Sequence, residues 1–438
     1  MQRHETPINV ARELCKQAPR VIGSIIDPAV GTGALLTPLI YRLKQQSSRV
    51  TCVDVDASVL KEVQPFLRSQ LGNAVRIINA DFLSWSERHC AGRRSGGYDC
   101  VIMNPPFAGK KDQWIELDLA HEFPGMMQGI RYAPREIGFL ARGIRLLNEG
   151  GRLLAIMPGS LVSSQTTRWF RDCLLKVGRV THVHELPQFT FPGVESRVYF
   201  VVFEKRKGEG KIVLCNHDLV APEKMSVKCT PDDEEHRWDY GYHFARERLR
   251  RIVVANNMTW CSLGAASDIL RGSAESPGGP DRAVHTNDYR NGFWRRAHRH
   301  KRHKRRLGRE LVQAGDILVK RVGRRGYLTF GKAVGVVGTA CSDCLLIVRP
   351  RIRLRSTELL FAIRTLTAFS WVRPLFERGT GASFQSEKGL REMPVPIEVS
   401  NRFPKMFRRY KDAILHRDYE EMQRIENWVA AHIEAGVD

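Results

Sequence analysis

The stretch Ser24-Ile25-Ile26-Asp27-Pro28-Ala29-Val30-Gly31-Thr32-Gly33 carries a short apolar strand that runs directly into a glycine-rich turn. A helical pattern begins just after the turn, and Gly31 and Gly33 would let the backbone turn tightly and a ligand approach closely. No Gly-Lys-Ser/Thr follows, which argues against a phosphate loop. Asp27, at the end of the strand, would suit a ligand that carries an ammonium group. Alone, such a turn is weak evidence of a binding site.

The surrounding chain, from residue 1 to about residue 205, alternates short apolar strands with helical patterns. The expected strands are 24–27, 49–54, 74–79, 100–103, 151–156 and 198–203, and the expected helices are 34–44, 57–69 and 135–148. Alternation of this kind predicts the α/β class, with a Rossmann-like, doubly wound sheet that binds its ligands at the carboxyl ends of the strands.

Acidic residues follow two of these strands. Asp54 ends the second strand about twenty residues after the glycine turn, where a carboxylate can accept hydrogen bonds from both hydroxyls of a ribose. Asp56 is expected to cap the next helix. Asp81 follows the third strand and could contact an adenine amine, although a helix cap is the alternative.

The fourth strand, 100–103, ends in Asn104-Pro105-Pro106-Phe107. Two successive prolines cannot donate to a sheet ladder, so this tetrapeptide ends the strand and starts a loop. The Asn104 side-chain oxygen and the Pro105 carbonyl can then accept hydrogen bonds side by side, with Phe107 stacked on a ring. That arrangement suits a planar exocyclic amine whose lone pair is tied up in conjugation. A plain proline-rich strand exit is the alternative.

Composition adds a second global fact to these motifs. The 438 residues carry a net charge of +22, which favours a polyanionic partner such as nucleic acid. We expect no signal peptide, no membrane span and reduced cysteines, and therefore a cytoplasmic location. Cys341 and Cys344 have zinc-like spacing but lack a second cysteine pair, so we expect no metal site.

The second half of the chain reads as short strands and glycine turns, around 260–272, 315–320 and 332–337. Between them lies the basic run 295–306, expected to contact phosphates or, alternatively, to be a solvated insertion without a defined role. A helical pattern closes the chain from about residue 407. The expected domains are 1–245, 246–405 and a C-terminal helical segment, 406–438.

The order of these motifs resembles the S-adenosylmethionine-dependent DNA methyltransferases of restriction-modification type that modify the N6 amine of adenine, in their gamma arrangement. Thr6 with Pro7 matches the segment that such enzymes place before the glycine loop. The resemblance implies a class I methyltransferase domain with S-adenosyl-L-methionine as cofactor. It implies cofactor binding by Thr6, Asp27, Ala29, Gly31, Gly33, Asp54, Asp81 and Asn104, and catalysis by Asn104, Pro105, Pro106, Phe107 and Phe191.

Phe191 enters this set through Thr190-Phe191-Pro192, which resembles the late motif whose aromatic ring stacks on the flipped base, with Phe189 as a competitor. The second half resembles target-recognition domains more loosely, at 314–319, 342–350 and 385–396. The resemblance implies double-stranded DNA as the substrate, with action at the nucleoid of a bacterium or archaeon. The basic run departs from the pattern. A restriction endonuclease, if the system has one, would be a separate protein.

Three alternatives stay open. The same tetrapeptide occurs in enzymes that methylate a protein glutamine amide or RNA, although these generally lack a large basic domain after the catalytic half. A non-catalytic DNA-binding specificity protein would be expected to carry a broken glycine loop or tetrapeptide, and both are intact here. Asn rather than Ser at position 104 favours adenine N6 over cytosine N4. The recognised DNA sequence cannot be read from these motifs.

Overall fold

The protein, here a computed structural model, divides into two units, Met1–Tyr240 (unit 1) and Gly241–Asp438 (unit 2). The structure describes residues 5–90, 97–107, 114–123, 129–192, 197–208, 210–217, 223–228, 236–256, 258–272, 283–295, 310–323, 329–352, 355–376, 385 and 387–436. The basic run lies outside these residues from position 296 onward, and so does the acidic stretch 231–235 of the expected junction.

Unit 1 is built on a mixed sheet that has nine strands in the described residues, in the order β11-β10-β8-β9-β7-β4-β1-β2-β3. These strands are β1 (Ser24–Asp27), β2 (Arg49–Asp54), β3 (Val75–Asn79), β4 (Tyr98–Met103), β7 (Leu147–Pro158), β8 (Arg179–Glu185), β9 (Val198–Glu204), β10 (Lys211–Asn216) and β11 (Glu223–Lys228). Strands β3, β2, β1, β4 and β7 are mutually parallel, whereas β9 runs antiparallel between β7 and β8.

Chain order reverses at β1, which pairs with β2 on one side and with β4 on the other. Such a reversal opens a crevice at the carboxyl ends of the central strands, the usual ligand position in α/β sheets. The chain leaves β1 through the glycine turn and leaves β4 through the Asn-Pro-Pro-Phe tetrapeptide, so both motifs lie at this crevice. The predicted α/β, Rossmann-like fold class is confirmed for unit 1.

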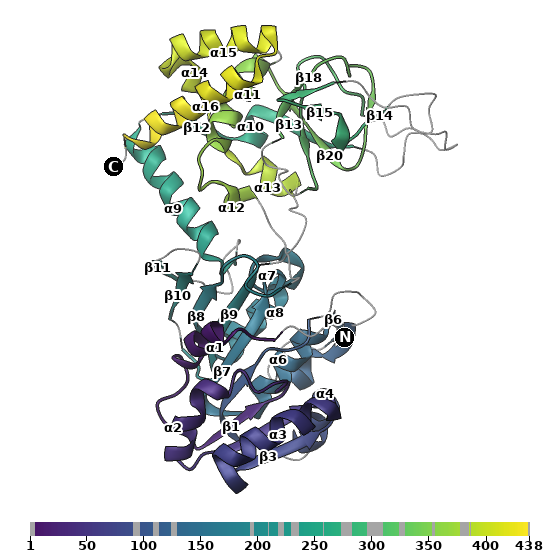
Figure 1. Ribbon diagram of the computed structural model, residues 1–438. Helices are drawn as coiled ribbons and strands as arrows, with labels where there is room; N and C mark the ends of the chain where they lie inside the picture. Colours follow the sequence, from purple (N-terminus) through teal and green to yellow (C-terminus); the bar gives the residue numbers. More distant parts are fainter. Residues whose placement is uncertain are drawn as a thin grey trace, which may run out of the picture. The chain divides into compact units, whose positions relative to one another are not determined.

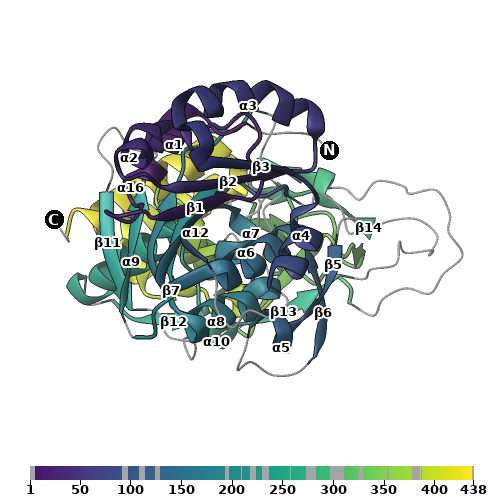
Figure 2. The ribbon, with the colours of Figure 1, turned by 90° about the horizontal axis from the view of Figure 1, so that it is seen from below.

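Helices cover both faces of this sheet (Figure 1), as the doubly wound prediction requires. They are α1 (Ile8–Cys15), α2 (Ile40–Gln45), α3 (Ala57–Leu71), α4 (Phe82–Cys90), α5 (Leu119–Glu122), α6 (Arg135–Leu146), α7 (Gly159–Ser163) and α8 (Arg168–Val177). Figure 2 shows α3 on one side of β1, β2 and β3, and α4 and α6 on the other. Buried side chains of α1, α2 and α3 form one core with alternate residues of β1, β2 and β4, the two-residue period expected of strands.

One local prediction in unit 1 needs correction, and one element was not predicted. The segment 34–44 is not one helix: a 3₁₀ turn at Thr37–Leu39 precedes α2, because Pro38 has no N–H to continue an α-helical ladder. The sequence also gave no sign of the hairpin formed by β5 (Trp114–Asp118) and β6 (Ile130–Pro134), which lies between the tetrapeptide and α6.

Unit 2 contains a sheet of six strands in its described residues, in the order β13-β20-β17-β18-β16-β15. These strands are β13 (Ser267–Arg271), β15 (Tyr289–Arg290), β16 (Phe293–Trp294), β17 (Ile317–Lys320), β18 (Gly331–Ala333) and β20 (Leu345–Pro350). Two short pairs accompany it, β12 (Trp260–Ser262) with β21 (Pro394–Pro396) and β14 (Ala283–Val284) with β19 (Ala340–Cys341). The expected strand around 260–272 is interrupted by a helical turn, α10 (Leu263–Ala266), because the Ser262 side chain accepts a hydrogen bond from the Ala265 N–H.

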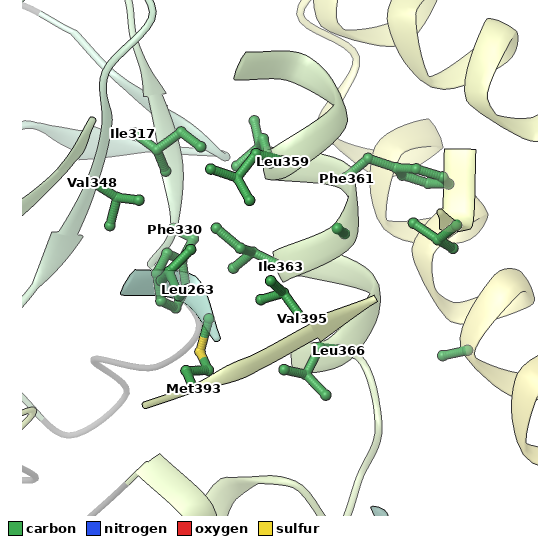
Figure 3. Packing of buried hydrophobic residues seen from close by; sticks show 14 of the residues in the cluster. Leu263, Ile317, Phe330, Val348, Leu359, Phe361, Ile363, Leu366, Met393 and Val395 are labelled. Carbon is green, nitrogen blue, oxygen red and sulfur yellow. The ribbon is translucent and has the colours of Figure 1, made fainter. Parts of the chain in front are cut away.

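One helix, α11 (Ser356–Thr367), organises the core of unit 2. Figure 3 shows Leu359 and Ile363 on the same side of α11 as Ile317 and Val348 of the sheet, with Phe361 directed to the other side. There the ring of Phe361 packs on Phe407 and Tyr410 at centroid distances of 5.4 and 4.7 Å. The remaining helices are α9 (Tyr240–Ala255), α12 (Arg373–Phe376), α13 (Glu387–Arg391), α14 (Val399–Arg402), α15 (Pro404–His416) and α16 (Tyr419–Glu434).

The structural division falls at the start of α9, five residues before the boundary expected after residue 245. The expected C-terminal helical segment forms two helices, α15 and α16, which pack into the core of unit 2 together with α11. None of the helices that the structure describes is long and apolar enough to cross a membrane.

Candidate active site

A cavity of about 890 Å³ opens in unit 1 at the carboxyl ends of the central strands. It brings together most of the residues that the sequence singled out, although they come from positions far apart in the chain. The predicted residues that line it are Thr6, Ala29, Gly31, Asp54, Asp81, Asn104, Pro105, Pro106, Phe107 and Phe191. Asp27 and Gly33 lie beside this group without lining the cavity.

The glycine turn has the backbone conformation that its sequence requires. Gly31 and Gly33 adopt φ angles of +49° and +78°, a region that residues with a Cβ rarely enter. A Cβ on Gly33 would also stand 3.0 Å from Val63 Cγ2, so α3 packs directly against the turn. The Gly31 N–H donates to Asp54 Oδ2 at 3.0 Å, which joins the turn to the end of β2.

Asp27 is fully buried beneath this turn. Its Oδ1 accepts a hydrogen bond from the Ala29 N–H at 3.1 Å, whereas Oδ2 has no hydrogen-bond partner among the described residues. Burial raises the pKa of the Asp27 carboxyl to about 7; the Ala29 N–H opposes this rise and the charge of Asp54 adds to it. A buried carboxylate oxygen without a donor is costly, so this atom is a strong candidate to meet a cationic ligand group.

Asp54 and Asp56, only two residues apart, have different hydrogen-bond partners. Asp54 lines the cavity and holds its loop with both oxygens, accepting from the Gly31 N–H and, at 3.0 Å, from the Asp56 N–H. Asp56 caps α3 by accepting from the Ser58 and Val59 N–H groups, which confirms the cap predicted for it.

Asp81 also lines the cavity, but other groups already engage its carboxylate. Oδ1 accepts from the Ser84 N–H at 3.0 Å, the helix-cap alternative considered above, and Oδ2 forms an ion pair with Arg135. Arg135 is the first residue of α6 and reaches the cavity too, with its guanidinium carbon 6.0 Å from the centroid of the Phe139 ring. Phe82 and Phe139, 5.1 Å apart between centroids, complete an aromatic wall at this end.

The sequence reasoning missed Arg135, Phe82 and Phe139. Phe82 directly follows Asp81, and this adjacency is the signal that could have found it. Arg135 and Phe139 follow the hairpin β5–β6, which the sequence did not reveal, and nothing local marks them as cavity residues.

The tetrapeptide leaves the end of β4 as predicted, with no regular secondary structure from Asn104 to Phe107. Asn104 is half-buried, and its Nδ2 donates to Thr6 Oγ1 at 3.1 Å. Pro105 is buried, and Phe107 packs against the core below α1 while still lining the cavity.

Phe191 and Phe189, the two candidates for a stacking ring, occupy different environments. Phe191 is 3% exposed and lines the cavity, whereas Phe189 is 67% exposed and has a φ of +64°. Only Phe191 of the two lies at the site. Its loop begins at Glu185, the last residue of β8, and ends before Arg197, with which Glu185 forms an ion pair.

A curated relative shares part of this chain. The type II methyltransferase M.BsuBI of Bacillus subtilis is 23% identical over 172 residues, which are 36% of this chain and 33% of the relative. The match therefore spans about a third of the length of that protein.

Solved structures resemble the chain in fold. The type IIL restriction-modification enzyme MmeI, in complex with DNA, aligns with 99% of this chain and 71% of its own, at a TM-score of 0.53 and 10% identity. A methyltransferase subunit of a type I restriction-modification system from Streptococcus thermophilus aligns with 49% of this chain and 47% of its own, at a TM-score of 0.42 and 19% identity.

The sequence model of one family, described as N-6 DNA Methylase, matches residues 4–246. This range is more than half of the 438 residues and contains every residue assigned above to the cavity. The chain therefore belongs to the N-6 DNA Methylase family.

Proposed function

We propose that the protein transfers a methyl group from S-adenosyl-L-methionine to the N6 amine of an adenine flipped out of double-stranded DNA. The observation that carries this proposal is the tetrapeptide Asn104–Phe107, which lines the same cavity as the glycine turn and Asp54. The cavity thus combines acceptors for an exocyclic amine with groups suited to a nucleoside.

The residues present fit the cofactor. Asp27 Oδ2 is buried and has no donor among the described residues, so it would receive the cofactor's ammonium group. The turn at Ala29, Gly31 and Gly33 would let the cofactor approach the backbone closely. Asp54 would accept from the ribose hydroxyls, since each of its oxygens keeps a lone pair beyond the bond it already makes. Thr6, Asn104 and Asp81, together with the aromatic wall, would complete the site.

When bound, S-adenosyl-L-methionine supplies an electrophilic methyl group on a sulfonium. Asn104 Oδ1 and the Pro105 carbonyl would accept the two hydrogens of the adenine amine and favour its pyramidal form, which exposes the nitrogen lone pair. Phe107 and Phe191 would stack on the flipped base, since a base inside a duplex cannot reach the cavity. Holding the nitrogen in line with the methyl group supplies most of the acceleration.

DNA recognition is assigned in this proposal to unit 2, in the gamma order of cofactor motif, catalytic motif and recognition domain. Two facts support it: the net charge of +22, and a fold likeness to a restriction-modification enzyme in complex with DNA that extends over 99% of the chain. We further propose that the protein acts at the nucleoid in the cytoplasm, in a restriction-modification or related defence system.

The first experiment is to express the chain in a bacterial host that lacks DNA methylation and to sequence its DNA with modification-sensitive reads. We expect N6-methyladenine at one short sequence motif. Unmodified DNA, despite protein that binds the cofactor, would argue against the proposal. Methyl transfer to RNA or to a glutamine amide instead would support the proposed cofactor site but contradict DNA as the substrate.

Asn104→Ala tests the tetrapeptide directly. Removing one oxygen acceptor should lower kcat by about a hundredfold or more while cofactor affinity falls only a few-fold. Asn73→Ala is the matched control, since Asn73 is exposed just before β3 begins and therefore lies at the opposite end of the sheet from the cavity. Methylation that survives Asn104→Ala would show that the tetrapeptide is wrongly assigned.

A further inference from the structure

We propose that Thr6 is a positioning residue: it fixes which end of the Asn104 amide faces the substrate, and it does so when the cofactor is bound. The inference rests on the proposed function and adds a role for Thr6 beyond lining the cofactor site. It arises from the hydrogen bond between Asn104 Nδ2 and Thr6 Oγ1, 3.1 Å long, which joins residues 98 positions apart in the sequence.

Both partners of this bond are held firmly. Thr6 is 8% exposed and lies directly before Pro7, whose carbonyl accepts the Ala11 N–H at the start of α1. Helix α1 is anchored by Val10, Ala11 and Leu14, all buried in the core of unit 1. Asn104 follows β4, which pairs with a strand on each side. The hydroxyl therefore has a fixed position relative to the amide.

The orientation of an amide matters because its two ends have opposite hydrogen-bonding character. Oδ1 can accept a hydrogen bond from the substrate amine. Nδ2 is itself a donor, so its hydrogens would repel those of the amine and no hydrogen bond would form. The bond to Thr6 holds Nδ2 on the α1 side of the cavity, so Oδ1 is turned toward the other side. Without this bond the two orientations would be closer in energy, and a fraction of the enzyme would present the wrong end.

A hydroxyl can donate as well as accept, so Thr6 alone would also tolerate the reversed amide. No acceptor for the Thr6 hydroxyl proton is found among the residues that the structure describes. Thr6 lines the cavity, so a bound cofactor, which carries a carboxylate and ribose oxygens, can accept that proton. Oγ1 then has only lone pairs left for Asn104, and the reversed amide loses its partner. Cofactor binding would in this way prepare Asn104 for the base.

The test compares Thr6→Val, which keeps the shape of the side chain and removes the hydroxyl, with Thr6→Ser, which restores the hydroxyl. The substrate is plasmid DNA from the methylation-free host, carrying the motif found by sequencing. We expect Thr6→Val to lower kcat about tenfold, the size of one lost hydrogen bond in a buried site, and Thr6→Ser to stay within about twofold of wild type. Thermal unfolding of both variants should match wild type within a few degrees.

Cofactor-dependent DNA binding is the second readout, because a merely structural role would not change it. S-adenosyl-L-homocysteine should tighten binding of a duplex containing the motif to wild type and to Thr6→Ser, but not to Thr6→Val. A Thr6→Val protein with wild-type kcat and intact tightening, or a Thr6→Ser protein as impaired as Thr6→Val, would overturn the inference. If Thr6→Val does not fold, Thr6→Ala carries the same expectations. Wild-type protein that methylates no DNA would overturn the proposed function itself, a result distinct from these.

Discussion

Two buried carboxylates, one in each unit, are satisfied to very different extents. Glu426 in unit 2 accepts from Arg364 through both oxygens, at 2.6 and 2.9 Å, and from the Tyr410 hydroxyl at 2.9 Å. Asp27 in unit 1 has one backbone donor and one oxygen without a partner among the described residues. Glu426 thus belongs to a polar network that holds a core together, whereas Asp27 keeps one oxygen for which we propose a ligand.

The surroundings of the two carboxylates extend this contrast. Arg364 also donates to the Phe330 carbonyl at 3.0 Å, so the network of Glu426 ties α11 to α15, α16 and the strand side of the core. In unit 1 the neighbouring acid, Asp54, stands on the wall of the cavity. We therefore expect substitutions in the first network to reduce stability and substitutions in the second to reduce ligand affinity.

Of the substitutions that test this comparison, Glu426→Gln should have the largest effect, a loss of unfolding free energy. The glutamine amide would place an N–H donor next to the N–H groups of the buried Arg364 guanidinium, and Arg364 would lose its counter-charge. Leaving a buried charge unpaired in this way typically costs about 3–5 kcal/mol of unfolding free energy. Chemical denaturation of the full chain measures this loss. Glu420→Gln, an exposed position on the same helix, is the control and should change stability by less than about 1 kcal/mol. Equal effects of the two variants would contradict the structural role of the network.

Asp54→Asn should show the opposite signature. The Nδ2 of the new asparagine is a donor, so it cannot accept from the backbone N–H or the ribose hydroxyl that it would face. We therefore expect cofactor affinity to fall about ten- to a hundredfold, while the unfolding free energy changes by about 1 kcal/mol. Calorimetric titration with S-adenosyl-L-methionine gives the first quantity. Asp418→Asn is the control, since Asp418 caps α16 and asparagine caps helices equally well. Unchanged cofactor affinity would show that Asp54 does not bind the cofactor.

The effect of Asp27→Asn on stability should depend on pH. Because burial raises the pKa of Asp27 to about 7, the folded protein keeps a proton that the unfolded chain releases near pH 4. Wild-type stability should therefore fall as pH rises between these values, by less than about 1.4 kcal/mol per pH unit. The variant cannot ionise, so its stability relative to wild type should grow from pH 5 to 7 and level off above about 8. A pH-independent difference in ligand-free protein would show that Asp27 does not titrate near 7.

Much of unit 1 was predictable because its signals are local. Strands β1 and β2 have the bounds expected from their apolar runs, and each ends in a residue that was predicted for the site, Asp27 and Asp54. The proline pair after Met103 ends β4 for a reason carried by its own backbone chemistry. In each of these elements, the apolar strand pattern, the residues that end the strand and the polar residue predicted for the site lie within fewer than ten positions.

Other features could not be predicted because their partners are distant in the sequence. The ion pair of Asp81 with Arg135 spans 54 positions, and that of Arg364 with Glu426 spans 62. No local pattern distinguishes these charges from exposed ones. The hairpin β5–β6 and the helical turn α10 were missed for a related reason: short elements hold their shape through contacts with the rest of the unit rather than through their own periodicity.

The assembly of the cavity from distant parts of the chain also has a consequence for biosynthesis. The cavity needs Thr6 from the first residues of the chain, Asn104 from the end of β4 and Phe191 from the loop after β8. A growing chain at the ribosome thus has no cofactor cavity until nearly two hundred residues have emerged, and its parallel strand pairs form only after long loops close. S-adenosyl-L-methionine can stabilise only a nearly complete unit 1, so truncated chains gain nothing from the cofactor and should be the ones that proteases remove.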